Sequence, residues 1–368
     1  MLRKINVLCC VAVMLLLGSC SSINTNADKP VKSKDGIDIS SIQSQFANRF
    51  DSIIEFYELT PDDMLVIGNK GRDYYAGKYD FKSNTFTETK TPLKYDGVHG
   101  FIGFLNDGFY TSTTDDISIY DDDLNLKQTI DAPNSADQRQ SYYNNPMALS
   151  KDGKKLYYSI NNNMTQNLME MDVQTNDKKV ITEYEKPDEL TMISAMAVTD
   201  DNTIAFVGQT LIPNKQERSV GSYGTINISS GKIDNHILNY IQFKYGNDIA
   251  LVTDRKDTRD TDKPKNYVLE LNGTTFEKHE VKSASYDVKP CSKHIFIAHD
   301  IYLTEDNKYK TYISSIYKDG KDIKDFDDSG KYKYLDYLTD FYSDKYGLYF
   351  QAVYDRYDQK NILNIKSV

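Results

Sequence analysis

The motif Asp-Arg-x-Asp occurs twice, each time directly after a short apolar run, in VTDRKDT at 252–258 and in VYDRYDQ at 353–359. Arginine beside aspartate suggests recognition chemistry. The planar guanidinium group binds carboxylate, sulfate or phosphate through two parallel hydrogen bonds and stacks on aromatic rings, which lysine does not. A structural role is also open, because a strand-end aspartate can accept backbone N–H groups in an Asx-turn and the arginine can pair with neighbouring carboxylates.

Arginine is rare beyond residue 20, where seven arginines stand against 35 lysines. Most of these arginines fall in polar loops between apolar runs, and some have paired tyrosines nearby. The candidate ligand-binding residues are Arg72, Arg139, Tyr142, Tyr143, Arg218, Asp254, Arg255, Asp355 and Arg356. We expect them to bind a ligand that carries anionic or polar planar groups, although arginine is also common in loops that only face solvent.

Motifs for other chemistries are missing from the sequence. It contains no nucleophile elbow, phosphate-binding loop or dinucleotide fingerprint. His294 and His299 stand at opposite ends and on opposite faces of one predicted strand, so they cannot share a metal there. The acidic run at 257–263 lacks the glycine of a calcium loop, so we expect its charges to be solvated turn residues, with weak calcium binding as the alternative. We therefore expect no catalytic motif, metal or cofactor, although carboxylates brought together from distant parts of the chain would leave no motif.

Internal repetition predicts the scaffold that positions these residues. A turn residue followed by a strongly apolar strand recurs seven times, at spacings of 44 to 55 residues. The seven turn residues are Asp63, Gly108, Gly153, Asn202, Gly246, Ser292 and Gly347. Periods of ~40–50 residues with four short strands each are typical of β-propeller blades. We predict an all-β, seven-bladed β-propeller as a single domain over residues 37–368, with six or eight blades as alternatives.

Two segments resemble known propeller repeats. SKDGKKLYYS at 150–159 and ISIYDDDLNLKQTI at 117–130 are similar to the WD40-like repeats of TolB-type propellers. The resemblance covers residues 37–368 at the level of the repeat, and it implies a fold and not a function. The last unit has only three predicted strands, so we expect the ring to be closed by an N-terminal strand, IDISSI at 37–42.

The repeat also predicts where the arginines lie within the blades. Aligned on the turn residues, Asp254-Arg255 and Asp355-Arg356 stand at the end of the second strand of their blades, and Arg72 has the same offset in the first. Strands A to D of a blade run alternately up and down, so the B–C loops and the D–A connections between blades share one face. We call this surface the recognition face and expect it to bind the ligand.

The first 20 residues predict the compartment. Arg3 and Lys4 precede an apolar stretch that is too short to span a bilayer, so residues 1–19 are predicted to be a signal peptide. Its end, Leu17-Gly18-Ser19-Cys20, resembles the lipobox of bacterial lipoproteins, and that resemblance implies lipidation of Cys20. An ordinary signal peptide that ends in cysteine is the alternative. Residues 20–36 are predicted to be a flexible tether, and the expected location is a bacterial outer membrane or cell surface.

The charge and the cysteine content limit the classes of partner that this chain is expected to bind. Without residues 1–19 the chain carries 42 basic and 54 acidic residues, a net charge of −12, which argues against nucleic acid. Cys291 is then the one cysteine besides Cys20, so we expect neither an internal disulfide nor a disulfide-linked partner. The leading hypothesis is a lipid-anchored binding or scaffold protein for an envelope protein or glycan. The alternative is an enzyme that acts on envelope polysaccharide or peptidoglycan through channel-facing carboxylates.

Overall fold

The computed structural model of this chain consists almost entirely of strands. It describes residues 37–95, 101–113, 116–133, 146–162, 165–184, 190–211, 219–238, 241–247, 249–255, 266–282, 287–303, 310–327, 335–355 and 360–368. No helix in this part of the chain is long and apolar enough to cross a membrane.

The strands form seven antiparallel sheets, which we number as blades 1 to 7 in chain order. Blade 1 contains β1 (Ser52–Thr60), β2 (Asp63–Lys70), β3 (Asp73–Asp80) and β4 (Thr85–Glu88). Blade 2 contains β5 (Phe101–Leu105), β6 (Gly108–Ser112), β7 (Asp116–Asp121) and β8 (Leu126–Asp131). Blade 3 contains β9 (Met147–Leu149), β10 (Lys155–Asn162), β11 (Thr165–Asp172) and β12 (Lys178–Tyr184). Blade 4 contains β13 (Leu190–Asp200), β14 (Thr203–Leu211), β15 (Ser219–Asn227) and β16 (Ile233–Leu238).

Blades 5 and 6 repeat the four-stranded plan, and blade 7 has three strands within the described residues. Blade 5 contains β17 (Ile241–Gly246), β18 (Ile249–Arg255), β19 (Asn266–Asn272) and β20 (Thr275–Val281). Blade 6 contains β21 (Asp287–Ser292), β22 (Ile295–Leu303), β23 (Lys310–Lys318) and β24 (Lys321–Asp327). Blade 7 contains β25 (Leu335–Ser343), β26 (Leu348–Asp355) and β27 (Lys360–Ser367).

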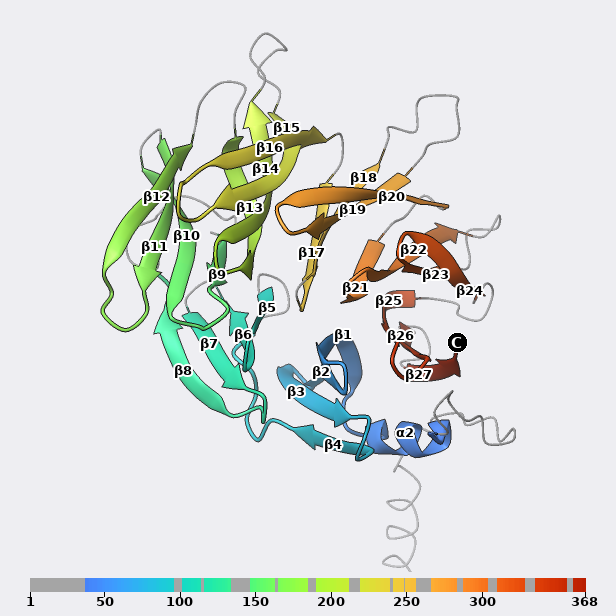
Figure 1. Ribbon diagram of the computed structural model, residues 1–368. Coiled ribbons are helices and arrows are strands. Elements are labelled where there is room, and N and C mark those ends of the chain that lie inside the picture. The colour runs from blue at the N-terminus through green and yellow to red at the C-terminus, as the bar shows by residue number, and fades with distance from the viewer. Residues whose placement is uncertain are drawn as a thin grey trace, which may run out of the picture.

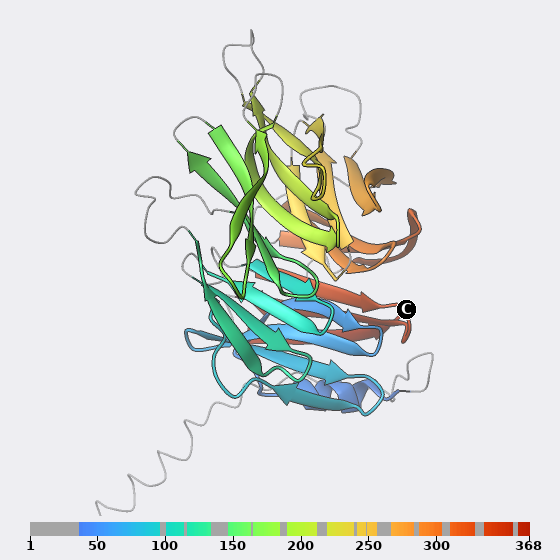
Figure 2. The ribbon, with the colours of Figure 1, turned by 60° about the vertical axis from the view of Figure 1, so that its left-hand side comes forward.

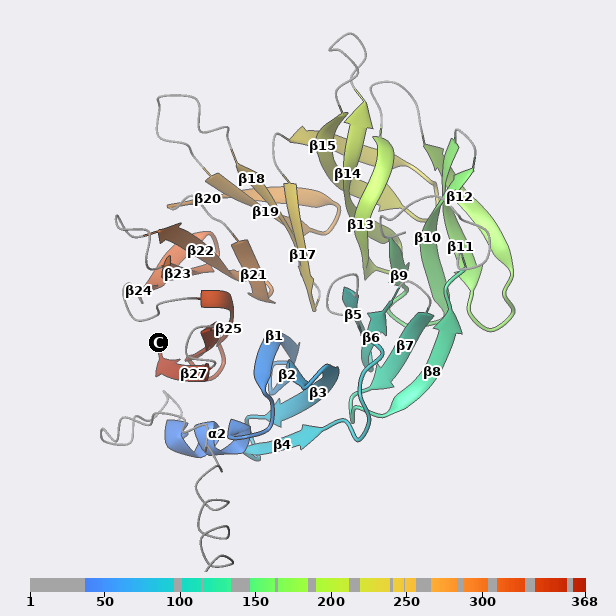
Figure 3. The ribbon, with the colours of Figure 1, turned by 180° about the vertical axis from the view of Figure 1, so that it is seen from behind.

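The seven blades surround a common centre, with the first strand of each blade innermost (Figure 1). Figure 3 shows the same ring from behind, and Figure 2 shows the molecule obliquely, turned by 60°. The prediction of a seven-bladed propeller is confirmed. All seven predicted turn residues lie at or beside the turn between the first two strands of a blade, and Gly153 and Gly347 have the positive φ angles, 71° and 58°, that favour glycine.

The predicted closing strand at 37–42 is wrong, because most of that segment forms the helix α2 (Ile39–Phe46). Asp38 caps the helix, and its Oδ1 accepts a hydrogen bond from the backbone N–H of Ser40 at 2.9 Å. Ile39, Ile42 and Phe46 follow a helical spacing, and all three are buried. Cap and spacing together stabilise a helix, which packs against β27 and β4 (Figures 1 and 3).

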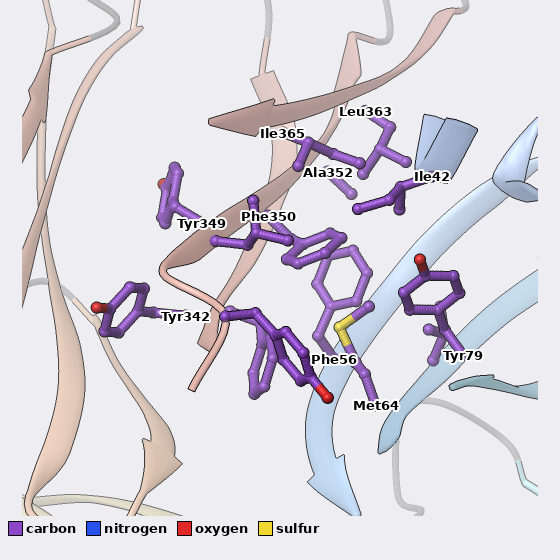
Figure 4. Close-up of a cluster of buried hydrophobic side chains, with 14 of the residues drawn as sticks. Ile42, Phe56, Met64, Tyr79, Tyr342, Tyr349, Phe350, Ala352, Leu363 and Ile365 are labelled. Carbon is purple, nitrogen blue, oxygen red and sulfur yellow. The ribbon is translucent and has the colours of Figure 1, made fainter. Parts of the chain in front are cut away.

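Apolar packing therefore joins the two ends of the ring. The largest described core cluster combines side chains of α2, blade 1, blade 6 and blade 7 (Figure 4). Phe350 of β26 lies at its centre, with its ring centroid 6.3 Å from the rings of Phe46, Phe56 and Phe341. Its side chain has no solvent exposure, so this interface between blades 7 and 1 excludes water.

The inner strands also meet across the middle of the ring. The ring of Tyr245 on β17 stacks against that of Phe101 on β5 at 6.2 Å, and its hydroxyl donates to the Val198 carbonyl at 3.0 Å. The side chain of Asn247, in the turn after β17, donates to the Leu59 carbonyl of β1 at 3.0 Å. Blade 5 thus makes direct contacts with blades 1, 2 and 4.

Candidate functional site

The predicted binding residues are only partly described. Arg72 lies in the turn between β2 and β3, and it is exposed. Asp254 and Arg255 are the last residues of β18, and Asp355 is the last residue of β26, although their side chains lie outside the described part. All four positions are at the B–C end of a blade, as predicted. The residues outside the described ranges are Cys20, Arg139, Tyr142, Tyr143, Arg218 and Arg356.

The turn that carries Arg72 is held in place by its neighbours. Gly71 has a φ of +64°, and its N–H donates to Asp51 Oδ2 at 2.6 Å. Close to this turn, Lys70 Nζ lies 5.0 Å from the ring centroid of Tyr75. Arg72, the Tyr75 ring and Lys70, which also pairs with Glu88, therefore lie at one corner of the recognition face; the arginine and tyrosine were predicted there, and the lysine was not.

Nearer the centre, a group of polar side chains joins four blades. We call it the inner polar cluster, and it consists of Glu55 on β1, Lys244 on β17, Asp287 and Lys289 on β21, and Thr339 on β25. Lys289 Nζ lies 2.7 and 2.9 Å from the two carboxylate oxygens of Glu55. Thr339 Oγ1 donates to Glu55 at 3.3 Å, and Lys244 Nζ lies 3.7 Å from Asp287. Positive and negative groups thus alternate from blade 5 through blade 6 to blade 1, and blade 7 contributes the neutral Thr339.

The inner polar cluster begins at the recognition face. Asp287 is the first residue of β21, at the D–A end of blade 6. The exposed fraction of the side chain is 31% for Lys244 and 25% for Asp287, but 9% for Lys289. Burial alone would raise the pKa of Asp287. The positive charges of Lys289 and Lys244 outweigh the effect of burial and lower this pKa overall. Asp287 is therefore ionised and partly accessible from this face.

A buried pair lies behind the inner polar cluster, between blades 6 and 7. His299 Nε2 lies 2.8 Å from Asp340 Oδ2, which also accepts the Tyr349 hydroxyl at 2.9 Å. The exposed fractions of the His299 and Asp340 side chains are 2% and 0%. Burial by itself would lower the pKa of His299, but the adjacent Asp340 carboxylate raises it overall. Among the described residues, none bonds to the other oxygen of Asp340.

Replacing Lys289 with methionine tests the charge pairing in the inner polar cluster. Methionine keeps most of the side-chain volume but leaves Glu55 without its ammonium partner in a half-buried position. We expect the free energy of unfolding to fall by about 2 kcal/mol, between the effects of breaking exposed and buried ion pairs. Urea unfolding measures the loss, and a change below about 0.5 kcal/mol would show that solvent replaces the partner at no cost.

Glu58, near the opposite end of β1, has a carboxyl group whose pKa is strongly raised. Burial, followed by the negative charge of Asp344, raises its pKa from 4.5 to about 7. Asp344 itself is held by Lys318 Nζ at 2.8 Å. A carboxyl pKa of about 7 suits proton transfer at neutral pH, and the residues around Glu58 in the sequence gave no indication of it.

Glu58 is expected to make stability depend on pH. A carboxyl with a raised pKa binds its proton more tightly in the folded state, so its contribution is complete below pH 4.5 and is lost as the pH rises through about 7. The Glu58→Gln variant should therefore match the parent at pH 4.5 and be more stable at pH 8. Thermal unfolding over this range measures the difference, and exposed Glu277→Gln on β20 is the control that should show none.

Comparisons with known proteins identify the fold and no family. No protein-family model and no curated protein matches the sequence. Among solved structures, the chain is similar to an oligogalacturonate lyase in complex with manganese, with 11% identity over 85% of this chain and 88% of that chain and a TM-score of 0.54. It is also similar to an oligogalacturonate lyase from Vibrio parahaemolyticus, with 12% identity over 86% of this chain and 91% of that chain and a TM-score of 0.55. The WD40 domain of Pan2 from Neurospora crassa matches with 11% identity, coverage of 85% and 88%, and a TM-score of 0.47.

At these identities the similarity shows a propeller fold and nothing about activity. Within the described residues, no group of three or more histidine, cysteine, aspartate or glutamate side chains could hold a metal ion.

Proposed function

We propose that this chain is a lipid-anchored protein of the bacterial cell envelope that binds a protein or glycan partner through its recognition face. In this proposal Cys20 carries the lipid, residues 20–36 tether the propeller, and the protein resides at the outer membrane or cell surface. The partner presents carboxylate, sulfate or other polar planar groups to the arginines of blades 1, 5 and 7.

One observation carries the proposal, the shared position of the arginines. Arg72 is exposed at the B–C turn of blade 1, and Arg255 ends strand B of blade 5. Arg356 directly follows Asp355, the end of strand B of blade 7. The inner polar cluster, which begins at the same face, spans blades 5, 6, 7 and 1. Fixed charges at the centre and arginines around it suit the recognition of a polar surface.

An enzyme that acts on envelope polysaccharide or peptidoglycan is the second candidate, and the raised pKa of Glu58 favours it. Two observations support binding instead. Glu55 and Asp287, the carboxylates of the inner polar cluster, have lysine neighbours, and Asp344 beside Glu58 is paired with Lys318. Glu58 also lies near the β1–β2 turn, at the end of the blade away from the arginines.

The test compares capture of envelope material by full-length parent protein and by the triple variant Arg72→Ala, Arg255→Ala, Arg356→Ala. The matched control replaces three exposed lysines in turns of the opposite face, Lys154, Lys232 and Lys293, with alanine. We expect the parent and the control to retain the same component and the arginine variant to lose at least tenfold of it. Protease or periodate treatment of the extract then distinguishes a protein from a glycan.

Equal capture by all three proteins would show that the arginines are structural and that another surface binds. Capture by none, together with release of sugars from envelope glycan that Glu58→Gln abolishes, would establish the enzyme instead.

A further inference from the structure

A row of mostly polar side chains crosses the joint between blades 6 and 7. On each blade the row follows cross-strand partners from one strand to the next, and the two rows meet where His299 Nε2 lies 2.8 Å from Asp340 Oδ2. We call the facing rows the polar seam, which consists of His299, Ser314 and Phe326 on blade 6 and of Asp340, Gln351 and Asn364 on blade 7.

Hydrogen bonds hold the blade 7 side of the polar seam in a fixed arrangement. The Tyr349 hydroxyl donates to Asp340 Oδ2 at 2.9 Å and accepts a hydrogen bond from Gln351 Nε2 at 3.2 Å. Asn364 Nδ2 donates to Gln351 Oε1 at 3.1 Å. None of these bonds involves Ser314 or the second oxygen of Asp340.

Three polar atoms of the polar seam have no hydrogen-bond partner among the described residues. They are Asp340 Oδ1, Ser314 Oγ and the second ring nitrogen of His299, Nδ1. The Asp340 and Ser314 side chains are fully buried, so bulk solvent does not pair with them. Native structures seldom leave such atoms unpaired, because the loss of their hydration is then not compensated.

The three unpaired atoms belong to one part of the polar seam. His299 and Ser314 are directly opposite each other on adjacent strands, so their side chains are neighbours on the same face of blade 6. Asp340 reaches this face from blade 7 through its contact with His299. Ser314 has the smallest side chain of the polar seam and lies between the larger rings of His299 and Phe326. The unpaired atoms therefore converge where only a small molecule would fit.

We propose that one ordered water molecule is bound beside Ser314 and joins blades 6 and 7. It accepts a hydrogen bond from His299 Nδ1–H and donates to Asp340 Oδ1 and Ser314 Oγ. Buried water molecules typically make about three hydrogen bonds to polar groups that would otherwise be unpaired, so one molecule satisfies all three atoms. The raised pKa of His299 agrees with this arrangement, because a protonated imidazole donates from both ring nitrogens.

Other occupants fit the polar seam less well. Within the described residues no group of three or more histidine, cysteine, aspartate or glutamate side chains could hold a metal ion, and a protonated His299 would repel a cation. A close apolar contact would leave all three atoms unpaired. Water is neutral and both donates and accepts, which matches the three atoms. The site is enclosed between two blades, so the proposal is independent of what binds at the recognition face.

The experiment is a high-resolution crystal structure of the full-length protein, together with structures of two variants. We expect a single peak of density at hydrogen-bond distances of ~2.5–3.2 Å from Asp340 Oδ1, Ser314 Oγ and His299 Nδ1. Ser314→Val adds bulk at the same place, so the peak should be absent from that variant. The matched control is Ser315→Val, which changes a buried serine on the opposite face of β23 and should leave the peak in place.

A solution measurement checks the hydrogen bond between the water and His299. Nuclear magnetic resonance of ring-labelled histidine follows the titration of His299 in the parent and in both variants. We expect His299 to titrate at a lower pH in Ser314→Val than in the parent, because the protonated ring loses its acceptor at Nδ1. In Ser315→Val it should titrate as in the parent.

Three results would overturn the proposal. Well-defined side chains with no peak between them would show that no molecule is bound in the polar seam. Contacts shorter than ~2.5 Å, or anomalous scattering from the peak, would assign a metal ion instead of water. An unchanged titration of His299 in Ser314→Val would show that no hydrogen bond to Nδ1 is lost. If that variant does not fold, the density in the parent still decides between a water molecule, a metal ion and no bound molecule.

Discussion

Replacing His299 with alanine is expected to lower the free energy of unfolding by about 3–5 kcal/mol, because the Asp340 carboxyl group would be left buried without its ion-pair partner. The pair is almost fully enclosed between blades 6 and 7, with exposed side-chain fractions of 2% and 0%. Tyr349 would be left as the donor to the shared oxygen of Asp340, and a single hydroxyl does not neutralise a buried carboxylate. Urea unfolding at pH 7 measures the loss.

The pH dependence of this loss and a double variant make the prediction specific. Because Asp340 raises the pKa of His299, the stability that protonation adds is complete below pH 6.5 and declines as the pH rises through the higher folded-state pKa. The difference between parent and His299→Ala should therefore narrow at pH 9. Adding Asp340→Asn to His299→Ala should recover part of the stability, since it removes the buried charge. Losses that are additive and independent of pH would contradict the account.

Replacing Phe350 with alanine is expected to cost about 3–5 kcal/mol and to loosen the closure of the ring. Its ring is fully buried and touches aromatic residues of α2, blade 1 and blade 7, so alanine would leave a cavity at the joint between the two ends of the chain. Urea unfolding measures the stability, and hydrogen exchange in β27 measures the loosening.

Leu126→Ala on β8 is the matched control for Phe350. Its side chain is 49% exposed on the outer strand of blade 2, so its loss should change stability by less than about 0.5 kcal/mol. A similar cost for both variants would show that the joint between blades 7 and 1 is no more sensitive than the surface. A large cost at Phe350 without faster exchange in β27 would show that α2 does not maintain the closure.

The number of blades could be predicted from the sequence because every blade repeats one physical pattern. A turn residue precedes an apolar second strand in all seven blades, and Gly153 and Gly347 adopt the backbone angles that such turns favour. The closing element could not be found in that way, since it occurs once. The cap at Asp38 and the helical spacing of Ile39, Ile42 and Phe46 compete with a strand reading of the same residues, and the helix forms.

The polar groups behind the recognition face are not arranged in any motif that can be recognised in the sequence. Glu55 and Lys289 are 234 residues apart, and His299 and Asp340 are 41 apart on different blades. Only the packing of neighbouring blades brings them together. One indication of these groups is present in the sequence: Lys289 and His299 interrupt predicted strands that are otherwise mostly apolar. The B–C position of Arg72 and Arg255 could be predicted, because it follows from the alternating direction of the strands.

The most direct test of the account is a hydrogen-exchange map of the full-length protein bound to the component that it captures from the envelope. We expect slower exchange in the turn at 70–73 and at the strand ends Asp254–Arg255 and Asp355, with no change in turns of the opposite face such as 150–154. Slower exchange confined to the opposite face would contradict the claim that the recognition face binds the partner.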